Sequence, residues 1–216
     1  PSPPATRAVL GRLLELSGGT EVVVLPTAKA YEHAGRVATA AEAHFRALGA
    51  TIRPAPVLHR TEAESPEIAA MVGAARFVYI ADGSPLHLRS VLKGSALFEA
   101  LVAAYRGGAV IAASGAGATV MCDPMVDPRG GAYTVGLGIV EGLAIFPYHG
   151  TAADHLRERS IELLPAGAVL AGIDVETALI RSPSARWTVE GAGAVTTYAG
   201  GATTTYRAGA VDLPLP

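Results

Sequence analysis

Residues 109–121 read AVIAASGAGATVM: a short apolar run, a turn made only of small residues, and a stretch typical of a helix. A strand that enters a helix through such a tight turn has the layout of a nucleophile elbow, which holds a reactive side chain above the end of a sheet. The elbow needs small residues two places before and after the nucleophile, and here these are Ala113 and Gly117. The nucleophile position is therefore Gly115, which has no side chain. The sequence predicts an elbow without its reactive group.

Strand-like and helical stretches alternate through the first half of the chain, a pattern typical of a parallel sheet with helices on its faces. Pro54 and Pro56 place the second strand at an edge of this sheet. From Val169 onward, short strand-like runs separated by glycine predict antiparallel hairpins. The predicted fold is α/β: a three-layer α/β/α sandwich with a mainly parallel central sheet and C-terminal antiparallel hairpins. The parallel strands are expected at Glu21–Leu25, Thr51–Leu58, Phe77–Ile80 and Ala109–Ala113.

Composition limits the classes of partner and cofactor. The chain has 216 residues, of which 50% are hydrophobic and 17% charged, which excludes disorder and allows a full core. A net charge of −2 gives no basic surface for nucleic acid or anionic lipid, and no apolar run is long enough for a spanning helix. Scattered histidines predict no metal, and the absence of a dinucleotide fingerprint predicts no cofactor. The single cysteine, Cys122, and the lack of a signal pattern predict a cytoplasmic protein.

The elbow and five other blocks resemble the dipeptidase E / cyanophycinase family of serine peptidases, which have the class I glutamine amidotransferase fold. That family carries G-x-S-A-G-A at the elbow, and this chain has A-S-G-A-G-A. The resemblance covers most of the chain and implies one domain of this type over residues 1–216. The remaining blocks follow in the family's order: VVVLPTA (Val22–Ala28), FVYIADGSPLHL (Phe77–Leu88), CDPMVDPRGG (Cys122–Gly131), GLAIFPYH (Gly142–His149) and GIDVETALI (Gly172–Ile180).

The departures from the family fall on the positions that the resemblance identifies as catalytic. The family's histidine directly follows a proline, whereas Tyr148 follows Pro147 here and His149 comes one place later. The family's acid follows the aspartate of G-I-D-E-x-T-A, whereas a valine follows Asp174 here and Glu176 comes next. The catalytic triad is therefore interpreted as lost.

Asp82 stands where the family has the first glycine of a loop that helps to form the oxyanion hole. A carboxylate there opposes an oxyanion, so Asp82 is a candidate general acid or base. The alternative is a local turn or a cap of the helix that begins near Pro85. With Tyr148 and His149, Asp82 completes the predicted catalytic set. The residues predicted to line the binding site are Gly83, Ser114, Gly115 and Ala116.

Ser114 and Cys122 are the alternatives to a lost nucleophile. Adjacent strand residues point to opposite faces, so Ser114 is expected to point away from the pocket. Cys122 lies in the helix that follows and is expected to be a small buried hydrophobe. His87 is expected to pack in a helix. Asp123, Asp127 and Arg129 are expected to form a charged loop beside the elbow, in which opposite charges make a structural pair.

Without a nucleophile, hydrolysis by the family's mechanism is not expected, because the triad acts as a unit. The leading hypothesis is a non-hydrolytic protein that acts on or binds a small molecule or peptide-derived metabolite, in the manner of an isomerase or cyclase. One alternative is a pseudoenzyme that binds or scaffolds another protein; another is a serine hydrolase or dipeptidase that uses Ser114. The N-terminal residues lack the strand that opens the family's fold, and a homodimer is one way to cover the exposed edge.

Overall fold

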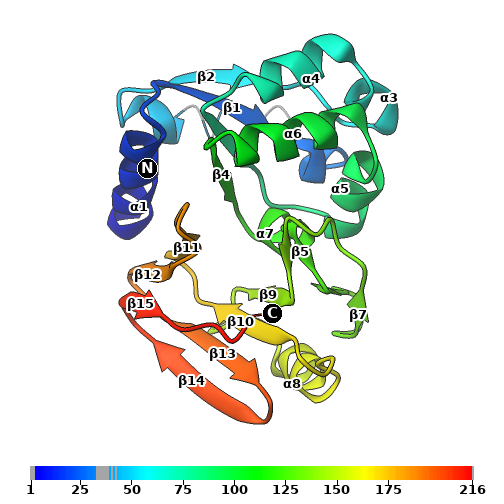
Figure 1. Cartoon of the computed structure of the whole chain (residues 1–216), viewed down its shortest axis with the longest axis vertical. Helices are drawn as coiled ribbons and strands as arrows, with labels where there is room; N and C mark the ends of the chain where they lie inside the picture. The colour runs from blue at the N-terminus through cyan, green and yellow to red at the C-terminus, as the bar shows by residue number, and fades with distance from the viewer. Residues whose placement is uncertain (1–2, 33–38, 40, 42, 216) are drawn as a thin grey trace. The chain divides into compact units, whose positions relative to one another are not determined.

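The computed structural model describes residues 3–32, 39, 41 and 43–215, and the chain divides into two compact units (Figure 1). The described residues of the first unit lie between 10 and 118, and those of the second lie between 119 and 215 together with residues 3–9. Two helices, α1 (Pro4–Ser17) and α7 (Ala116–Met121), contribute residues to both units. The expectation of a single domain stays a prediction.

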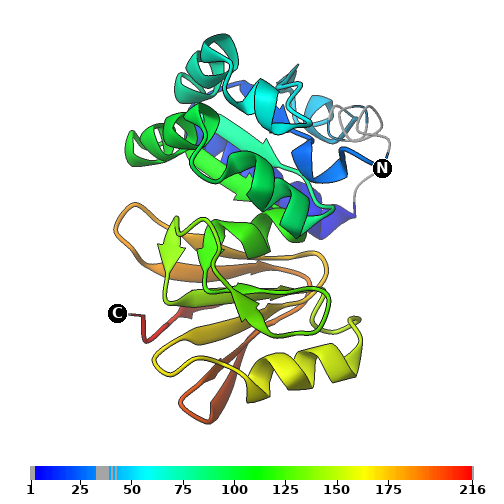
Figure 2. The ribbon, with the colours of Figure 1, turned by 90° about the vertical axis from the view of Figure 1, so that its right-hand side faces the viewer.

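A parallel sheet with the strand order β2-β1-β3-β4 organises the first unit. Each pair of neighbours in this sheet is parallel. Figure 2 shows the cyan-to-green helices of this unit beside the strands. The elements are β1 (Glu21–Leu25), the 3₁₀ helix η1 (Thr27–Lys29), β2 (Thr51–Pro54), α3 (Arg60–Ala63), α4 (Pro66–Gly73), β3 (Phe77–Ile80), α5 (Pro85–Leu92), α6 (Ala96–Arg106) and β4 (Val110–Ala113).

The apolar strands of the first unit form its core because both faces of a parallel sheet are covered. On one face, Val22 and Val24 of β1 pack with Phe45 and Phe77, all 1% exposed or less. The strand β2 lies at an edge, as its prolines predict, and it ends at Pro54 rather than at Leu58. The α/β fold class is confirmed.

The second unit is built on a sheet with the order β14-β13-β10-β9, in which only β9 and β10 are parallel. A separate antiparallel sheet has the order β11-β12-β15, so the predicted C-terminal hairpins are confirmed. The elements are β5 (Cys122–Asp123), β6 (Met125–Val126), β7 (Tyr133–Thr134), β8 (Val140–Glu141), β9 (Leu143–Pro147), α8 (Asp154–Glu162), β10 (Val169–Ile173), β11 (Thr177–Arg181), β12 (Trp187–Gly191), β13 (Val195–Ala199), β14 (Ala202–Tyr206) and β15 (Gly209–Val211).

A small apolar cluster joins the helix α8 to the main sheet of the second unit. Ala144 and Phe146 of β9 and Leu170 of β10 are buried, and Leu156 and Ile161 of α8 pack against them. In the part of the chain that the structure describes, no helix is both long and apolar enough to cross a membrane.

Cys122, one of the alternative nucleophiles, is 4% exposed at the start of β5. Burial, with a smaller contribution from the charge of Asp123, raises the pKa of its thiol to about 12. Because the thiolate is the reactive form of cysteine, this thiol is inert at neutral pH.

We therefore expect Cys122 to resist iodoacetamide at pH 8 in the folded protein and to react fully in guanidinium chloride. A pKa near 12 in place of the usual 8.5 lowers the thiolate fraction at this pH by roughly three orders of magnitude. Intact-protein mass spectrometry over time measures the added carbamidomethyl group. Alkylation of the folded protein at the rate of a free cysteine would contradict the burial.

Candidate functional site

The elbow turn of the first unit consists of two residues, Ser114 and Gly115, between the strand β4 and the helix α7. Gly115 has a φ of +48°, a left-handed conformation that glycine adopts without a Cβ penalty. The neighbouring strand β3 ends beside this turn. Ile80, its last residue, pairs with Ala113, and the carbonyl of Ile80 accepts from the N–H of Ser114 at 3.1 Å. The loop after β3 therefore lies next to the elbow.

The carboxylate of Asp82, in the loop after β3, occupies the space above the elbow. Its Oδ1 accepts hydrogen bonds from the backbone N–H groups of Gly83 and Ala116, each at 2.7 Å. A nucleophile elbow uses the N–H of the residue after the nucleophile, with a second N–H from another loop, to bind an oxyanion. In this chain a carboxylate of the protein itself accepts from both donors. A Cβ on Gly115 would overlap the same carboxylate.

The helix-cap alternative for Asp82 is wrong, because the cap of α5 is Ser84, whose Oγ accepts from the N–H of His87 at 3.3 Å. Four residues of the predicted site, Asp82, Gly83, Gly115 and Ala116, are thus brought together in the first unit.

The loop that carries Asp82 is pressed against η1. The N–H of Ser84 donates to the carbonyl of Ala28 at 2.7 Å, and a Cβ on Gly83 would overlap that carbonyl. The pKa of Lys29 in η1 is raised, first by its hydrogen bond to Glu32 and to a lesser extent by the charge of Asp82. Asp82 therefore has a cation in its electrostatic surroundings as well as two N–H donors.

Ser114 points to a different partner from Asp82. Its Oγ lies 3.1 Å from the hydroxyl of Tyr79, a residue of β3 whose pKa is raised by burial. The hydrogen bond to Ser114 lowers this pKa and the charge of Asp82 raises it further, both as smaller effects. The partner of Ser114 is thus a neutral phenol and not a base.

The second unit places a histidine and an acid at the ends of two parallel strands. His149 follows β9 and Asp174 follows β10, and these strands are in register, with Phe146 opposite Gly172. The Nδ1 of His149 lies 3.4 Å from the Oδ1 of Asp174, with side-chain exposures of 14% and 26%. The other carboxylate oxygen, Oδ2, accepts from the N–H of Ala194 at 3.0 Å. The acid that faces His149 is therefore Asp174, and Glu176 lies in an exposed turn.

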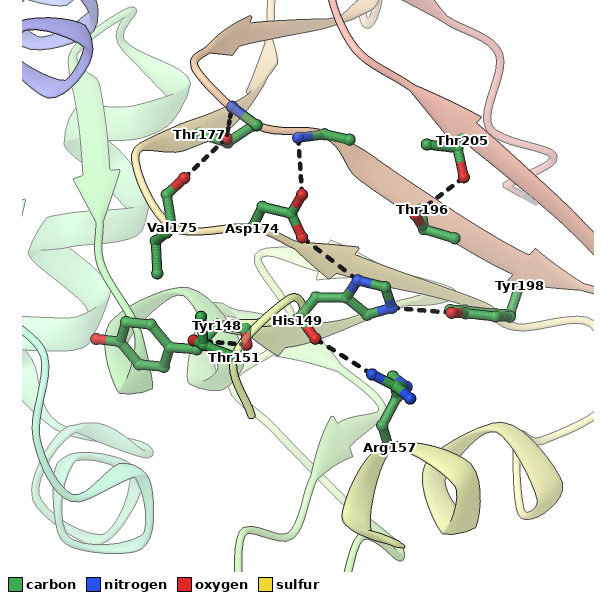
Figure 3. A network of polar contacts seen from close by, with 12 residues as sticks. Tyr148, His149, Thr151, Arg157, Asp174, Val175, Thr177, Thr196, Tyr198 and Thr205 are labelled. Atoms are coloured by element: carbon green, nitrogen blue, oxygen red, sulfur yellow. Dashed lines mark hydrogen bonds and ion pairs between the residues drawn. The ribbon is translucent and has the colours of Figure 1, made fainter. Parts of the chain in front are cut away.

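The second nitrogen of His149 contacts a tyrosine that no sequence motif marks. Nε2 lies 2.8 Å from the hydroxyl of Tyr198 on β13 (Figure 3). Because a carboxylate only accepts hydrogen bonds, its position beside Nδ1 favours the neutral tautomer that is protonated there, and in that tautomer Nε2 accepts from Tyr198. Asp174, His149 and Tyr198 form a continuous chain of polar contacts.

Two glycines leave space for the side chains of this polar network. A Cβ on Gly172 would overlap the ring of His149, and a Cβ on Gly193 would lie 2.7 Å from the Cβ of Asp174. In addition, the N–H of His149 donates to the carbonyl of Ile173 at 3.0 Å. The position of His149 beside β10 is therefore held by its backbone hydrogen bond and by the contacts of both ring nitrogens.

Tyr148, the other tyrosine next to the histidine, points away from the ring of His149 in Figure 3. It has a φ of +57°, its side chain is exposed, and its carbonyl accepts from the N–H groups of Thr151 and Ala152. A left-handed conformation at a non-glycine residue is costly and is concentrated at functional sites. A catalytic role for Tyr148 stays a prediction.

The remaining candidates are structural. Arg129 forms an ion pair with Asp127, as expected, and lowers the pKa of that carboxyl mainly through their side-chain hydrogen bond. The Nε2 of His87 lies 2.7 Å from the carbonyl oxygen of Leu58, consistent with packing. Across the described ranges, no group of three or more histidine, cysteine or acidic side chains is placed to hold a metal ion.

We expect Gly115→Ala to destabilise the protein by about 1–3 kcal/mol, because the new Cβ meets the Asp82 carboxylate and the backbone is left-handed. In an Asp82→Gly background the cost falls by about 1 kcal/mol, since the collision is gone and only the conformational cost remains. Urea denaturation of the four members of this double-mutant cycle gives the coupling. Additive effects of the two substitutions would show that Asp82 does not fill the position above Gly115.

We expect Gly172→Ala to displace the imidazole of His149 and break its contact with Tyr198 or Asp174. The measurement is the chemical shift of the His149 ring in ¹H–¹³C NMR spectra, together with the free energy of unfolding. Gly130→Ala is the matched control, because a Cβ at Gly130 meets no atom within 4 Å. Unchanged His149 signals in Gly172→Ala would contradict the placement of the ring.

Comparisons with known proteins agree with the family resemblance that the sequence blocks carry. A search of the curated proteins finds no match to this chain. A peptidase from an acI-B1 Actinobacterium has a similar crystal structure, with a TM-score of 0.86 and 26% identity over 97% of this chain and 92% of that one. A putative Peptidase E protein from Listeria monocytogenes EGD-e shares the fold, with a TM-score of 0.63 and 14% identity over 94% of this chain and 93% of that one. The model of Peptidase family S51 matches residues 4–179, so the chain belongs to this family, the dipeptidase E family.

Proposed function

We propose that this member of Peptidase family S51 does not hydrolyse peptides and instead acts on, or binds, a small molecule or peptide-derived metabolite through acid–base chemistry. The observation that carries the proposal is the position of Asp82, whose Oδ1 accepts from the N–H groups of both Gly83 and Ala116. A tetrahedral intermediate needs these donors free to receive its oxyanion. Gly115 in addition offers no hydroxyl to form an acyl-enzyme.

The second unit supports acid–base chemistry. His149 is held between Asp174 and Tyr198, with Gly172 leaving space for its ring. A histidine oriented by a neighbouring carboxylate is the usual group for moving protons near neutral pH. The first unit thus lacks a nucleophile with open oxyanion donors, while the second has a complete acid–base pair. Isomerase- or cyclase-type reactions need an acid–base pair, and they do not need a nucleophile with open oxyanion donors.

The serine-hydrolase alternative has weaker support. Ser114 is hydrogen-bonded to Tyr79, whose burial keeps its phenol protonated, so this partner cannot remove the serine proton. The scaffold alternative requires an exposed apolar surface. A shallow groove of about 300 Å³ lies on α6, between Phe98, Val102 and Arg106. Its volume is at the lower end of the range for small-ligand sites, and it explains nothing about the network around His149.

A reducing compartment fits a chain whose single cysteine is buried and unpaired, so we place the reaction in the cytoplasm. A homodimer remains our proposal for the assembly.

The test is hydrogen–deuterium exchange catalysed by the intact protein. A defined mixture of dipeptides, hydroxy acids and keto acids is incubated in D₂O and followed by ¹H NMR. We expect loss of signal at a carbon next to a carbonyl in at least one component, without cleavage of any peptide bond. His149→Gln should slow this exchange on the order of 100-fold, the usual contribution of a general base.

His155→Gln is the matched control, because His155 is an exposed histidine of α8 in the same unit. Cleavage of a peptide that Ser114→Ala abolishes would overturn the proposal in favour of the serine hydrolase. Neither exchange nor cleavage would favour the scaffold. A fluorophosphonate probe, which labels activated serines, should leave Ser114 unlabelled, as peptide mass spectrometry of the wild-type protein can show.

A further inference from the structure

We infer that Tyr198 takes the place of the missing serine as the hydroxyl group that the His149–Asp174 pair activates. The chain then contains an Asp–His–Tyr proton relay whose phenol oxygen exchanges a proton with the ligand. This inference rests on the proposed non-hydrolytic function for the identity of the reaction, but its test needs no substrate.

The contacts of His149 match the roles in a hydrolase triad, with one partner changed. In a triad the acid holds Nδ1–H, and Nε2 accepts from the nucleophile's hydroxyl. Here Asp174 lies at Nδ1 and the hydroxyl of Tyr198 lies 2.8 Å from Nε2. The hydroxyl that contacts the basic nitrogen is therefore phenolic (Figure 3).

Tyr198 is held in place by its strand and its ring. On β13 it stands between Leu170 of β10 and Thr203 of β14, so strands flank it on both sides. Its ring packs against the buried cluster that contains Phe146 and Leu170. Such packing fixes the rotamer and aims the hydroxyl at the imidazole, as positioned acid–base groups require. The side chain is only half-buried, so solvent or a ligand can reach it.

Charges around Tyr198 suit a phenol that is neutral at rest. Burial raises the pKa of Tyr198, Arg157 lowers it as the next largest effect, and Asp174 raises it. Arg157 forms an ion pair with Asp154 at 2.7 Å and donates to the carbonyl of His149 at 3.5 Å. The guanidinium is thus placed to stabilise negative charge on the phenol oxygen while a proton is away.

The proton balance of the relay is closed. Nε2 of His149 takes the hydroxyl proton of Tyr198, and the phenolate oxygen then takes one proton from the ligand. Tyr198 then gives one proton to a different atom of the ligand, and the imidazolium of His149 returns its proton to the phenolate, which restores both side chains. No bond to the protein forms, and no electron donor or acceptor is needed.

The experiment uses an aryl sulfonyl fluoride, which reacts with activated tyrosines. The phenolate oxygen attacks sulfur, an O–S bond forms, the S–F bond breaks, fluoride leaves, and His149 receives the phenol proton. Labelled residues are identified by peptide mass spectrometry at pH 7.5. We expect Tyr198 to be labelled faster than Tyr31 and Tyr148, although these two are the more exposed residues, at 76% and 43%.

His149→Gln and Asp174→Asn should each slow labelling of Tyr198 at least tenfold, within the usual contribution of a general base. The same variants should leave Tyr31 unchanged, which also shows that the protein is folded. His155→Gln is the control that alters no rate, and Tyr198→Phe confirms the site. The inference would be overturned by labelling that follows exposure alone, or by a Tyr198 rate that both relay variants leave unchanged. The labelling test of Tyr198 can therefore fail while the exchange experiment supports the proposed function. It can also succeed when the exchange experiment fails.

Discussion

One carboxylate oxygen ties together the two loops at the carboxyl ends of β3 and β4. Strand ends and helix starts leave backbone N–H groups without partners, and such groups need an acceptor when water is excluded. In this chain Asp82 is that acceptor, bound by Gly83 and Ala116 at 2.7 Å each. Hydrogen bonds to a charged group contribute about 1.5–3 kcal/mol each, so an external anion competes poorly for these donors. The carboxylate also requires Gly115, because any Cβ there would overlap it. The glycine at position 115 and the carboxylate at position 82 are therefore one steric and electrostatic arrangement.

In the second unit, by contrast, the polar contacts expected of a catalytic histidine are present. His149 keeps a carboxylate at one nitrogen and a hydroxyl at the other, and Gly172 leaves space that the imidazole fills. The neighbouring Tyr148 is held at a φ of +57°, a conformation that costs on the order of 1–3 kcal/mol in a non-glycine residue. A partly buried polar network has to be satisfied throughout, or it destabilises the fold. The intact network is easier to reconcile with proton chemistry than with a surface that serves only as a scaffold.

Much of this arrangement could be predicted from the sequence. The parts that could not be predicted depend on contacts between residues that lie far apart in the chain. The strands β1, β3 and β4 are mostly continuous apolar runs, so their existence and class were predictable, whereas β2 is a short polar edge strand that ends early because proline cannot donate to a ladder. The empty nucleophile position at Gly115 follows from local spacing. The role of Asp82 as an internal acceptor does not, because it depends on an N–H group 34 residues away.

Tyr198 is harder still to predict. It lies 49 residues from His149, on a hairpin strand with no motif around it. Only the pairing of β13 with β10 brings it near. For Asp174 a usable signal existed, since it directly follows a predicted strand, and the carboxyl ends of parallel strands collect functional residues.

Under the proposed relay, the change from an aliphatic hydroxyl to a phenol has a chemical consequence. A phenol, with an ordinary pKa near 10, is a much stronger acid than an aliphatic alcohol. It therefore gives its proton to an imidazole at a lower free-energy cost than serine does. The resulting phenolate is stabilised by its ring and is a weaker nucleophile than an alkoxide, so it favours returning a proton over attacking a carbonyl. With the oxyanion donors already bound to Asp82, an attack would also lack stabilisation of its tetrahedral product. The same histidine and aspartate that support acyl transfer beside a serine are thus suited, beside Tyr198, to proton transfer.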